Sequence, residues 1–96
     1  MFELKKQLDL LGYQAEDRVT AIKGIITSIS FDLYGCIQIL LNPGIDKDGK
    51  LRDLVWLDVN RVKVLSEKPV MDQPNFNAIS GPMDLKGPEK KPVFGI

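Results

Sequence analysis

Short runs of β-branched and aliphatic residues, separated by turn-forming residues, constrain the fold of this chain more than any other feature. In residues 19–31 such side chains nearly alternate with Thr and Ser, and a second apolar run covers residues 36–41. Two more runs follow at residues 54–57 and 61–65. Because alternating and β-branched runs of this length are typical of half-buried strands, each is predicted to be a β-strand.

The residues between these runs favour tight turns. Residues 42–44, Asn-Pro-Gly, end the second strand, and residues 46–50, Asp-Lys-Asp-Gly-Lys, predict a hairpin turn in which Gly49 takes positive φ. Residues 58–60, Asp-Val-Asn, predict a tight corner before the last strand. Gly24 inside the first long run predicts a bend or bulge.

The length of this region limits the architecture. It offers about fifty residues, whereas a two-sheet sandwich of the immunoglobulin type takes roughly 100. We therefore predict a mainly β fold, as a small, strongly bent antiparallel sheet or an SH3-like barrel. The residues expected to face its core are Val19, Ile25, Ile29, Ile37, Ile39, Val55, Leu57, Val62 and Val64.

The two ends differ from the middle. Leu4, Leu8 and Leu11 have helical spacing and Gly12 stands where a helix C-cap glycine is expected, so residues 1–12 predict a short amphipathic helix. After Ser66, recurrent Pro and Gly exclude regular structure, which gives a β domain over residues 13–66 and an extended or disordered tail over residues 67–96. Since helix and tail both carry apolar residues, we expect either to pack on the barrel or on a second subunit, as in a homo-oligomer.

Several chemistries are excluded by composition. The chain has no histidine and one cysteine, so it lacks the commonest general base, the usual zinc ligand sets and any internal disulfide. Cys36 lies in an apolar run and is expected to fill the core. If Gly49 were the sixth residue of a calcium loop, Gly44 and Val55 would occupy the first and last ligand positions, which neither side chain can serve. We expect no catalytic residue, no metal and no cofactor.

Charge and hydropathy limit the partners. Thirteen basic residues balance thirteen acidic ones, whereas dedicated nucleic-acid binders are usually basic, so nucleic acid is disfavoured. No apolar run approaches the roughly 20 residues of a membrane span. The first residues also lack the apolar stretch of a signal peptide. These features predict a reduced, cytoplasmic setting without membrane attachment.

Two aromatic residues are candidates for ligand contact, because a flat aromatic face can stack on a base or anchor a partner. Trp56 lies in an apolar run, so packing in the core is favoured and a binding role is the alternative. Tyr34 stands at an expected bend, between Asp32-Leu33 and Gly35, where a surface position and a buried position are both open.

Residues 13–65 also resemble a family of small bacteriophage and prophage proteins. The likeness rests on Asp17-Arg18-Val19-Thr20 and Gly24, on the run Phe31-Asp32-Leu33-Tyr34-Gly35-Cys36, and on Trp56-Leu57-Asp58 before Arg61-Val62. Ala21-Ile22 stand where relatives often carry Gly-Phe, and the long tail is less typical of them. The family has no settled activity, so the resemblance implies a phage origin, a bacterial host and a compact β fold.

These observations predict a non-catalytic, phage-encoded accessory binding protein, with itself or a host protein as partner. One alternative is an anti-defence sponge that sequesters a cyclic or ADP-ribose-type nucleotide at a subunit interface. Such a site would stack the base on Tyr34 or Trp56 and hold phosphates with Arg18, Lys23, Arg52 or Arg61. A second alternative is a nucleic-acid-binding SH3-like module.

Overall fold

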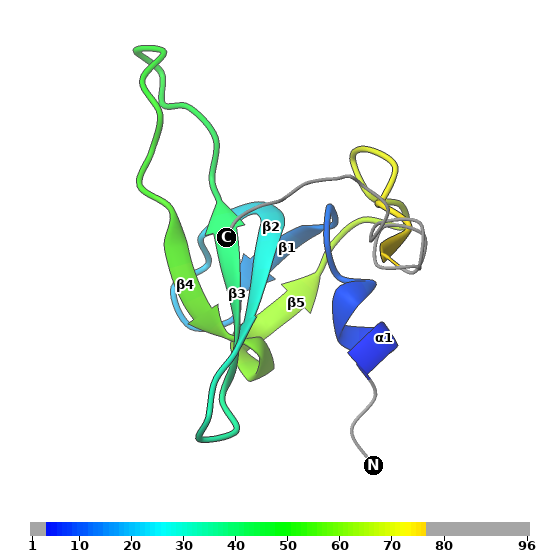
Figure 1. The fold of residues 1–96 in the computed structure, drawn as a ribbon. Helices are drawn as coiled ribbons and strands as arrows, with labels where there is room; N and C mark the ends of the chain where they lie inside the picture. Colours follow the sequence, from blue (N-terminus) through cyan, green and yellow to red (C-terminus); the bar gives the residue numbers. More distant parts are fainter. Residues whose placement is uncertain (1–3, 77–96) are drawn as a thin grey trace, which may run out of the picture.

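The computed structural model describes residues 4–76, in which five strands form one antiparallel sheet (Figure 1). Its elements in chain order are α1 (Leu4–Leu8), β1 (Gln14–Asp17), β2 (Lys23–Phe31), β3 (Ile37–Asn42), β4 (Val55–Asp58), the 3-10 turn η1 (Val59–Arg61) and β5 (Val62–Val64). The predicted mainly β fold with a short N-terminal helix is confirmed. No helix within residues 4–76 has the length and apolar character needed to cross a membrane.

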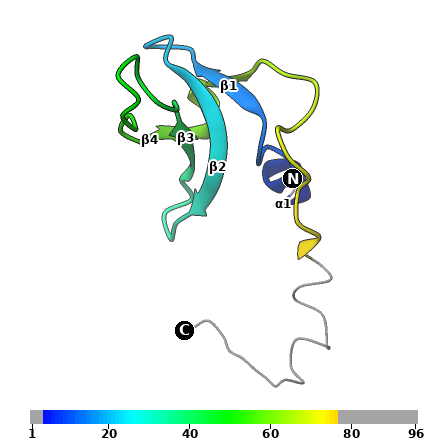
Figure 2. The same ribbon diagram turned by 90° about the horizontal axis from the view of Figure 1, so that it is seen from above.

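The sheet is strongly curled. Its strand order is β4-β3-β2-β1-β5, so β4 and β5 are its two edges although only the three residues of η1 separate them in sequence. Four strand spacings of about 4.8 Å would hold the edges of a flat sheet roughly 19 Å apart. A three-residue 3-10 turn rises only about 6 Å. The sheet must therefore bend to bring the end of β4 close to the start of β5, and the curvature of β2 in Figure 2 follows this bend.

The long strand β2 combines an irregularity with a close approach to β3. The register between the two strands shifts between Ile26 and Ser28, not at Gly24 where the bend or bulge was expected. Gly24 has a different role, because a Cβ atom there would lie 2.4 Å from the carbonyl oxygen of Asn42. Glycine thus allows the start of β2 to approach the end of β3.

The hydrophobic core is small. Within residues 4–76 its fully buried members are Ala15, Ile26, Ile39, Leu41 and Leu57, of which the sequence predicted Ile39 and Leu57. Ile25, Ile29, Ile37, Val55 and Val62, also predicted inward, are half-buried.

The inward positions predicted for Val19 and Val64 are wrong. Val19 is 72% exposed because residues 18–22 form the turn between β1 and β2 rather than the start of a strand. Val64 is exposed because it is the last residue of the edge strand β5. The strand that pairs with both β2 and β5 is instead β1, a Gln-Ala-Glu-Asp segment that the apolar pattern did not reveal.

The start of the tail packs against the N-terminal segment. Helix α1 is shorter than predicted, and a turn follows it to Gly12, whose φ is +89°. The Val70 N–H donates to the Gly12 carbonyl at 2.8 Å, and Gln73 Nε2 donates to the carbonyls of Asp9 and Leu11 at 2.9 and 2.7 Å. Figure 2 shows the two segments side by side. The remaining predictions for the tail concern residues 77–96, outside the described residues.

Candidate binding surfaces

Asp32 organises the turn between β2 and β3. Its Oδ1 accepts hydrogen bonds from the backbone N–H groups of Tyr34 and Cys36, both at 2.9 Å. Its own N–H donates to the Cys36 carbonyl and its carbonyl accepts from the Gly35 N–H, both at 3.2 Å. Gly35 takes a positive φ of 87°, which glycine adopts without strain. Hydrogen bonds that converge on one aspartate therefore fix the backbone of this turn.

Leu33 and Tyr34, which we call the turn tip, project from this fixed backbone. Their side chains are 89% and 85% exposed. Of the two positions left open for Tyr34 by the sequence, the structure shows the surface position. Because the backbone of the tip is already ordered, binding of a partner there would cost little conformational entropy. Tyrosine is also enriched among residues that dominate binding energy.

Cys36 is exposed, so its predicted place in the core is wrong. It belongs to the turn that Asp32 organises and precedes β3, whose first residue is Ile37. The negative charge of Asp32 raises the pKa of the Cys36 thiol above its ordinary value, with partial loss of solvation and the charge of Asp58 acting in the same direction. Because the thiolate is the nucleophilic form, this environment disfavours reaction at Cys36.

Trp56 lies on the outer face of the sheet. It is 49% exposed, whereas its neighbour Leu57 is buried and Val55 packs against the core, so the predicted core position of Trp56 is wrong. Trp56 pairs with Leu40 on β3, which is half-buried on the same face. Together with Leu54, which is 51% exposed, these residues form an apolar strip at the edge of the sheet.

Arg61, one of the predicted phosphate ligands, forms an ion pair with Asp17. Arg61 Nε donates to Asp17 Oδ1 at 3.0 Å and Nη2 donates to Oδ2 at 2.6 Å. The same carboxylate accepts from the hydroxyl of Thr20 at 2.6 Å and from the Val19 N–H at 3.1 Å. Asp17 is 1% exposed, so these partners compensate a buried charge.

This pairing ties Arg61 to the fold. The hydrogen bonds from Arg61, followed by those from Thr20 and Val19, hold the pKa of Asp17 well below its usual range despite the burial. The pKa of Arg61 is raised in turn, chiefly by its hydrogen bonds to Asp17. A bidentate Arg–carboxylate pair satisfies much of the guanidinium, so a phosphate at Arg61 would have to compete with Asp17.

The other predicted cations are exposed but dispersed. Arg18 follows β1, Lys23 begins β2, and Arg52 lies in the long hairpin connection between β3 and β4. That connection projects from the opposite end of the sheet to the β2–β3 turn (Figure 1). Arg52 is thus remote from Tyr34 in the same chain, and the six predicted ligand residues do not gather at one place.

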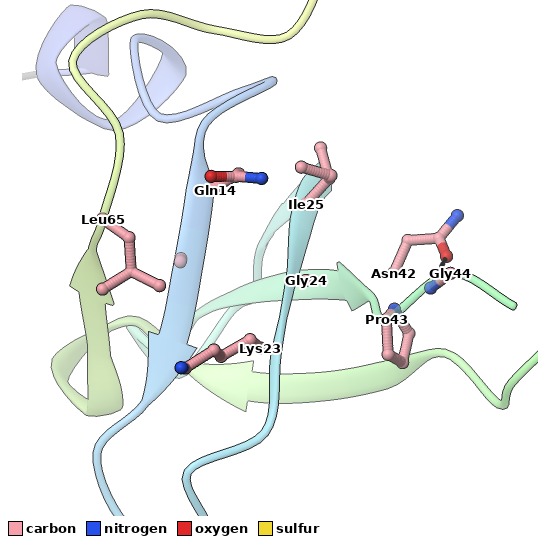
Figure 3. Close-up of a pocket in the computed structure, with 9 residues that line it drawn as sticks. Gln14, Lys23, Gly24, Ile25, Asn42, Pro43, Gly44 and Leu65 are labelled. Atoms are coloured by element: carbon pink, nitrogen blue, oxygen red, sulfur yellow. Dashed lines mark hydrogen bonds between the residues drawn. The ribbon is translucent and has the colours of Figure 1, made fainter. Parts of the chain in front are cut away.

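Within residues 4–76, two pockets that border the sheet were not expected from the sequence. One, of about 300 Å³, lies between β1, β2 and the end of β3, and Lys23 is the one predicted ligand residue that lines it (Figure 3). The other, of about 430 Å³, is mostly apolar and runs between β2 and residues 70–76. No sequence pattern indicates this second pocket, because its walls come from segments distant in the chain that each lack a motif.

The segment from Asp46 to Lys50 is the hairpin turn that its composition predicts. Asp46 Oδ1 accepts from the N–H groups of Asp48 and Lys50 at 2.8 and 3.0 Å, and Gly49 takes a φ of +82°. This carboxylate is engaged by the backbone of its own loop. Within residues 4–76, no group of three or more His, Cys, Asp or Glu side chains is placed to hold a metal ion.

Comparison with known proteins adds no assignment to this geometry. No protein-family model, no curated protein and no solved structure matches the chain.

Proposed function

We propose that this chain is a non-catalytic binding protein that engages a protein partner through the turn tip, Leu33 and Tyr34. The observation that carries the proposal is the distribution of apolar surface. Within residues 4–76, fifteen large hydrophobic side chains are exposed and only five hydrophobic residues are fully buried. Single exposed apolar residues are ordinary on a protein surface. Two adjacent ones, almost fully exposed on a backbone fixed by Asp32, favour an anchor for a partner.

The surroundings of the tip favour a protein over a nucleotide. Arg61 is engaged by Asp17, Arg52 lies at the other end of the sheet, and the charged side chain that organises the tip is the acidic Asp32. Phosphate recognition needs converging cations, and within residues 4–76 the predicted ones do not converge on Tyr34. The resemblance to small phage proteins suggests a bacterial host protein as the partner.

The first test compares capture of host proteins by three forms of the chain. Leu33→Ser with Tyr34→Ser should abolish specific capture from a bacterial lysate, and titration of the purified partner should give the same loss. The matched control is Leu51→Ser, because Leu51 is also highly exposed but lies on the other hairpin. Circular dichroism checks that all three forms are folded. Equal capture by the tip variant and the wild type would refute the proposal.

The second test distinguishes the other ligand classes. In a thermal-shift screen against nucleotide second messengers, RNA and DNA, we expect no stabilisation. A ligand present at 100 times its Kd adds about 2.7 kcal/mol, which such a screen detects readily. If a nucleotide stabilises the wild type and Tyr34→Ala abolishes this stabilisation, the nucleotide sponge becomes the favoured function in place of the protein-binding one. Stabilisation by RNA or DNA would favour the nucleic-acid-binding module.

A further inference from the structure

The two edges of the sheet differ in how well they are protected against pairing with another chain. Strand β5 has three residues with Lys63 at its centre, and a short edge with a central lysine resists pairing. Strand β4, Val-Trp-Leu-Asp, contains no lysine, proline or bulge. Among residues 4–76 it pairs only with β3, so its other side is open. The β4 edge is therefore the one suited to strand addition.

The hairpin extends this edge beyond β4. Leu41 pairs with Val55, and Ile45 forms a bridge to Leu51. The two arms of the hairpin therefore contain the same number of residues between these two pairs. The Arg52 N–H also donates to the Gly44 carbonyl at 2.8 Å, in the same register. Residues 52–54 lie outside β4, but the residue count from β4 to the bridge is the same on both sides of the hairpin, and we assign their faces by that count. Alternate positions along the line of residues 52–58 share one face of the sheet.

Along the outer face of this line, a positively charged residue is followed by two apolar residues and then by a negatively charged one. Its members, which we call the β4 row, are Arg52, Leu54, Trp56 and Asp58, and all four are exposed. No ion pair between Arg52 or Asp58 and another residue forms within the described part of the chain. Asp58 Oδ1 accepts from the Asn60 N–H at 2.8 Å. Its second oxygen accepts no hydrogen bond from another residue in the range 4–76.

The order of residues in the β4 row is self-complementary. In an antiparallel pair, residues opposite each other lie on the same face, so even-numbered positions must oppose even-numbered positions. If Val55 opposes Val55 of a second copy, Leu54 opposes Trp56 and Arg52 opposes Asp58, each twice. Moving the centre to Trp56 or to Leu57 puts Asp58 opposite an apolar residue. The register centred on Val55 is the one that matches charge with charge and apolar with apolar.

We propose that two copies of this chain pair through their β4 edges, antiparallel about a two-fold axis at Val55, to form one continuous sheet. The second copy is favoured over an unrelated partner because an isologous contact requires self-complementarity, which the β4 row has in both charge and apolar character. This contact goes beyond the proposed function and does not use the turn tip. It also differs from the contact expected from the sequence, which would have used the helix or the tail.

A charge exchange tests this pairing. Arg52→Asp places two acidic residues opposite each other in its own dimer, and Asp58→Arg places two basic residues there. Light scattering coupled to size exclusion should give a dimer for the full-length wild type and a monomer for each variant alone. An equimolar mixture of the two variants should restore the dimer, because both pairs are again of opposite charge. A monomeric wild type, or a dimer that survives in each variant alone, would overturn the proposal.

A cross-link tests the register and does not depend on Asp58, whose side chain also caps η1. In a Cys36→Ser background, Val55→Cys should form a disulfide-linked dimer on mild oxidation, because directly opposed strand residues lie within disulfide reach. The matched control is Lys63→Cys on the β5 edge, which should stay monomeric in a reducing-agent-free gel. Equal cross-linking of both variants, or none at position 55, would exclude this register. The Leu33→Ser, Tyr34→Ser form should keep the dimer, so this proposal and the proposed function can fail separately.

Discussion

Replacing Ile39 by alanine is the most direct test of the core. Ile39 is 0% exposed and lies on β3, opposite Ile29 on β2 and Leu57 on β4. The substitution removes three carbons, which at about 0.8 kcal/mol for each buried carbon costs about 2.4 kcal/mol. The cavity left behind adds to this loss, and measured Ile→Ala changes in cores fall in the range of about 2–5 kcal/mol.

We therefore expect Ile39→Ala to lower the free energy of unfolding by about 3 kcal/mol. For a domain of this size, 1 kcal/mol corresponds to about 4–8 °C in the melting midpoint, so the loss is about 12 °C or more. This is a large fraction of the total, because small domains unfold at a cost of only about 5–15 kcal/mol. Ile39→Val, which removes one carbon, should cost about 0.5–1.5 kcal/mol.

Urea unfolding followed by far-ultraviolet circular dichroism, with Trp56 fluorescence as a second probe, measures these differences. The matched control is Val19→Ala, because the apolar pattern placed both residues in the core and the structure exposes Val19. Its effect should stay within about 0.5 kcal/mol. If Val19→Ala lowered the free energy of unfolding as much as Ile39→Ala, with the same slope against urea concentration, the described core would be wrong.

Three further outcomes are expected. The low pKa of Asp17 stabilises the fold at pH values above the ordinary carboxyl range, and this contribution is lost as the pH falls below about 4, toward the folded-state pKa. Between pH 7 and pH 2 the melting midpoint of Asp17→Asn should therefore fall less than that of the wild type, and at pH 7 the variant should be the less stable of the two. An equal fall in both proteins would contradict this role of Asp17. Gly24→Ala should lower the melting midpoint because the new Cβ would meet the Asn42 carbonyl oxygen, and an unchanged midpoint would mean that β2 and β3 do not approach so closely. Cys36→Ser should leave the midpoint unchanged since Cys36 is exposed, and a marked loss in the same melt would return Cys36 to the core.

The sequence predicted those parts of the fold that apolar periodicity controls. Strands β2 to β5 and the corner at η1 were recognised because apolar runs alternate there with turn signals. Strand β1 was missed because only Ala15 of its four residues is apolar, and its position depends on pairing with β2 and β5. Its buried charge, Asp17, is compatible with a strand only because Arg61 lies on a segment far along the chain. Local pattern carries no information about such a partner.

The same limit applies to the candidate site. Tyr34 was selected at a bend and is exposed, whereas Trp56 was expected in the core because it stands between Val55 and Leu57, whose faces are opposite to its own. Arg61 resembles any exposed cation in the sequence until its pairing with Asp17 is known. The proposed complementarity of Arg52 with Asp58 depends on the register of the hairpin, which the sequence does not reveal.

The pairing of β1 with β5 also has a consequence for the order in which this protein folds. The hairpins β2–β3 and β3–β4 join neighbours in sequence, so their closure costs little chain entropy. The contact between Asp17 and Arg61 joins residues 44 positions apart and must wait until the intervening strands are in place. The β2–β3–β4 meander is therefore expected to form early and β1–β5 to close last. Amide hydrogens of β5, at the end of the ladder, should then exchange with solvent through local opening while those of β3 exchange only when the whole sheet unfolds.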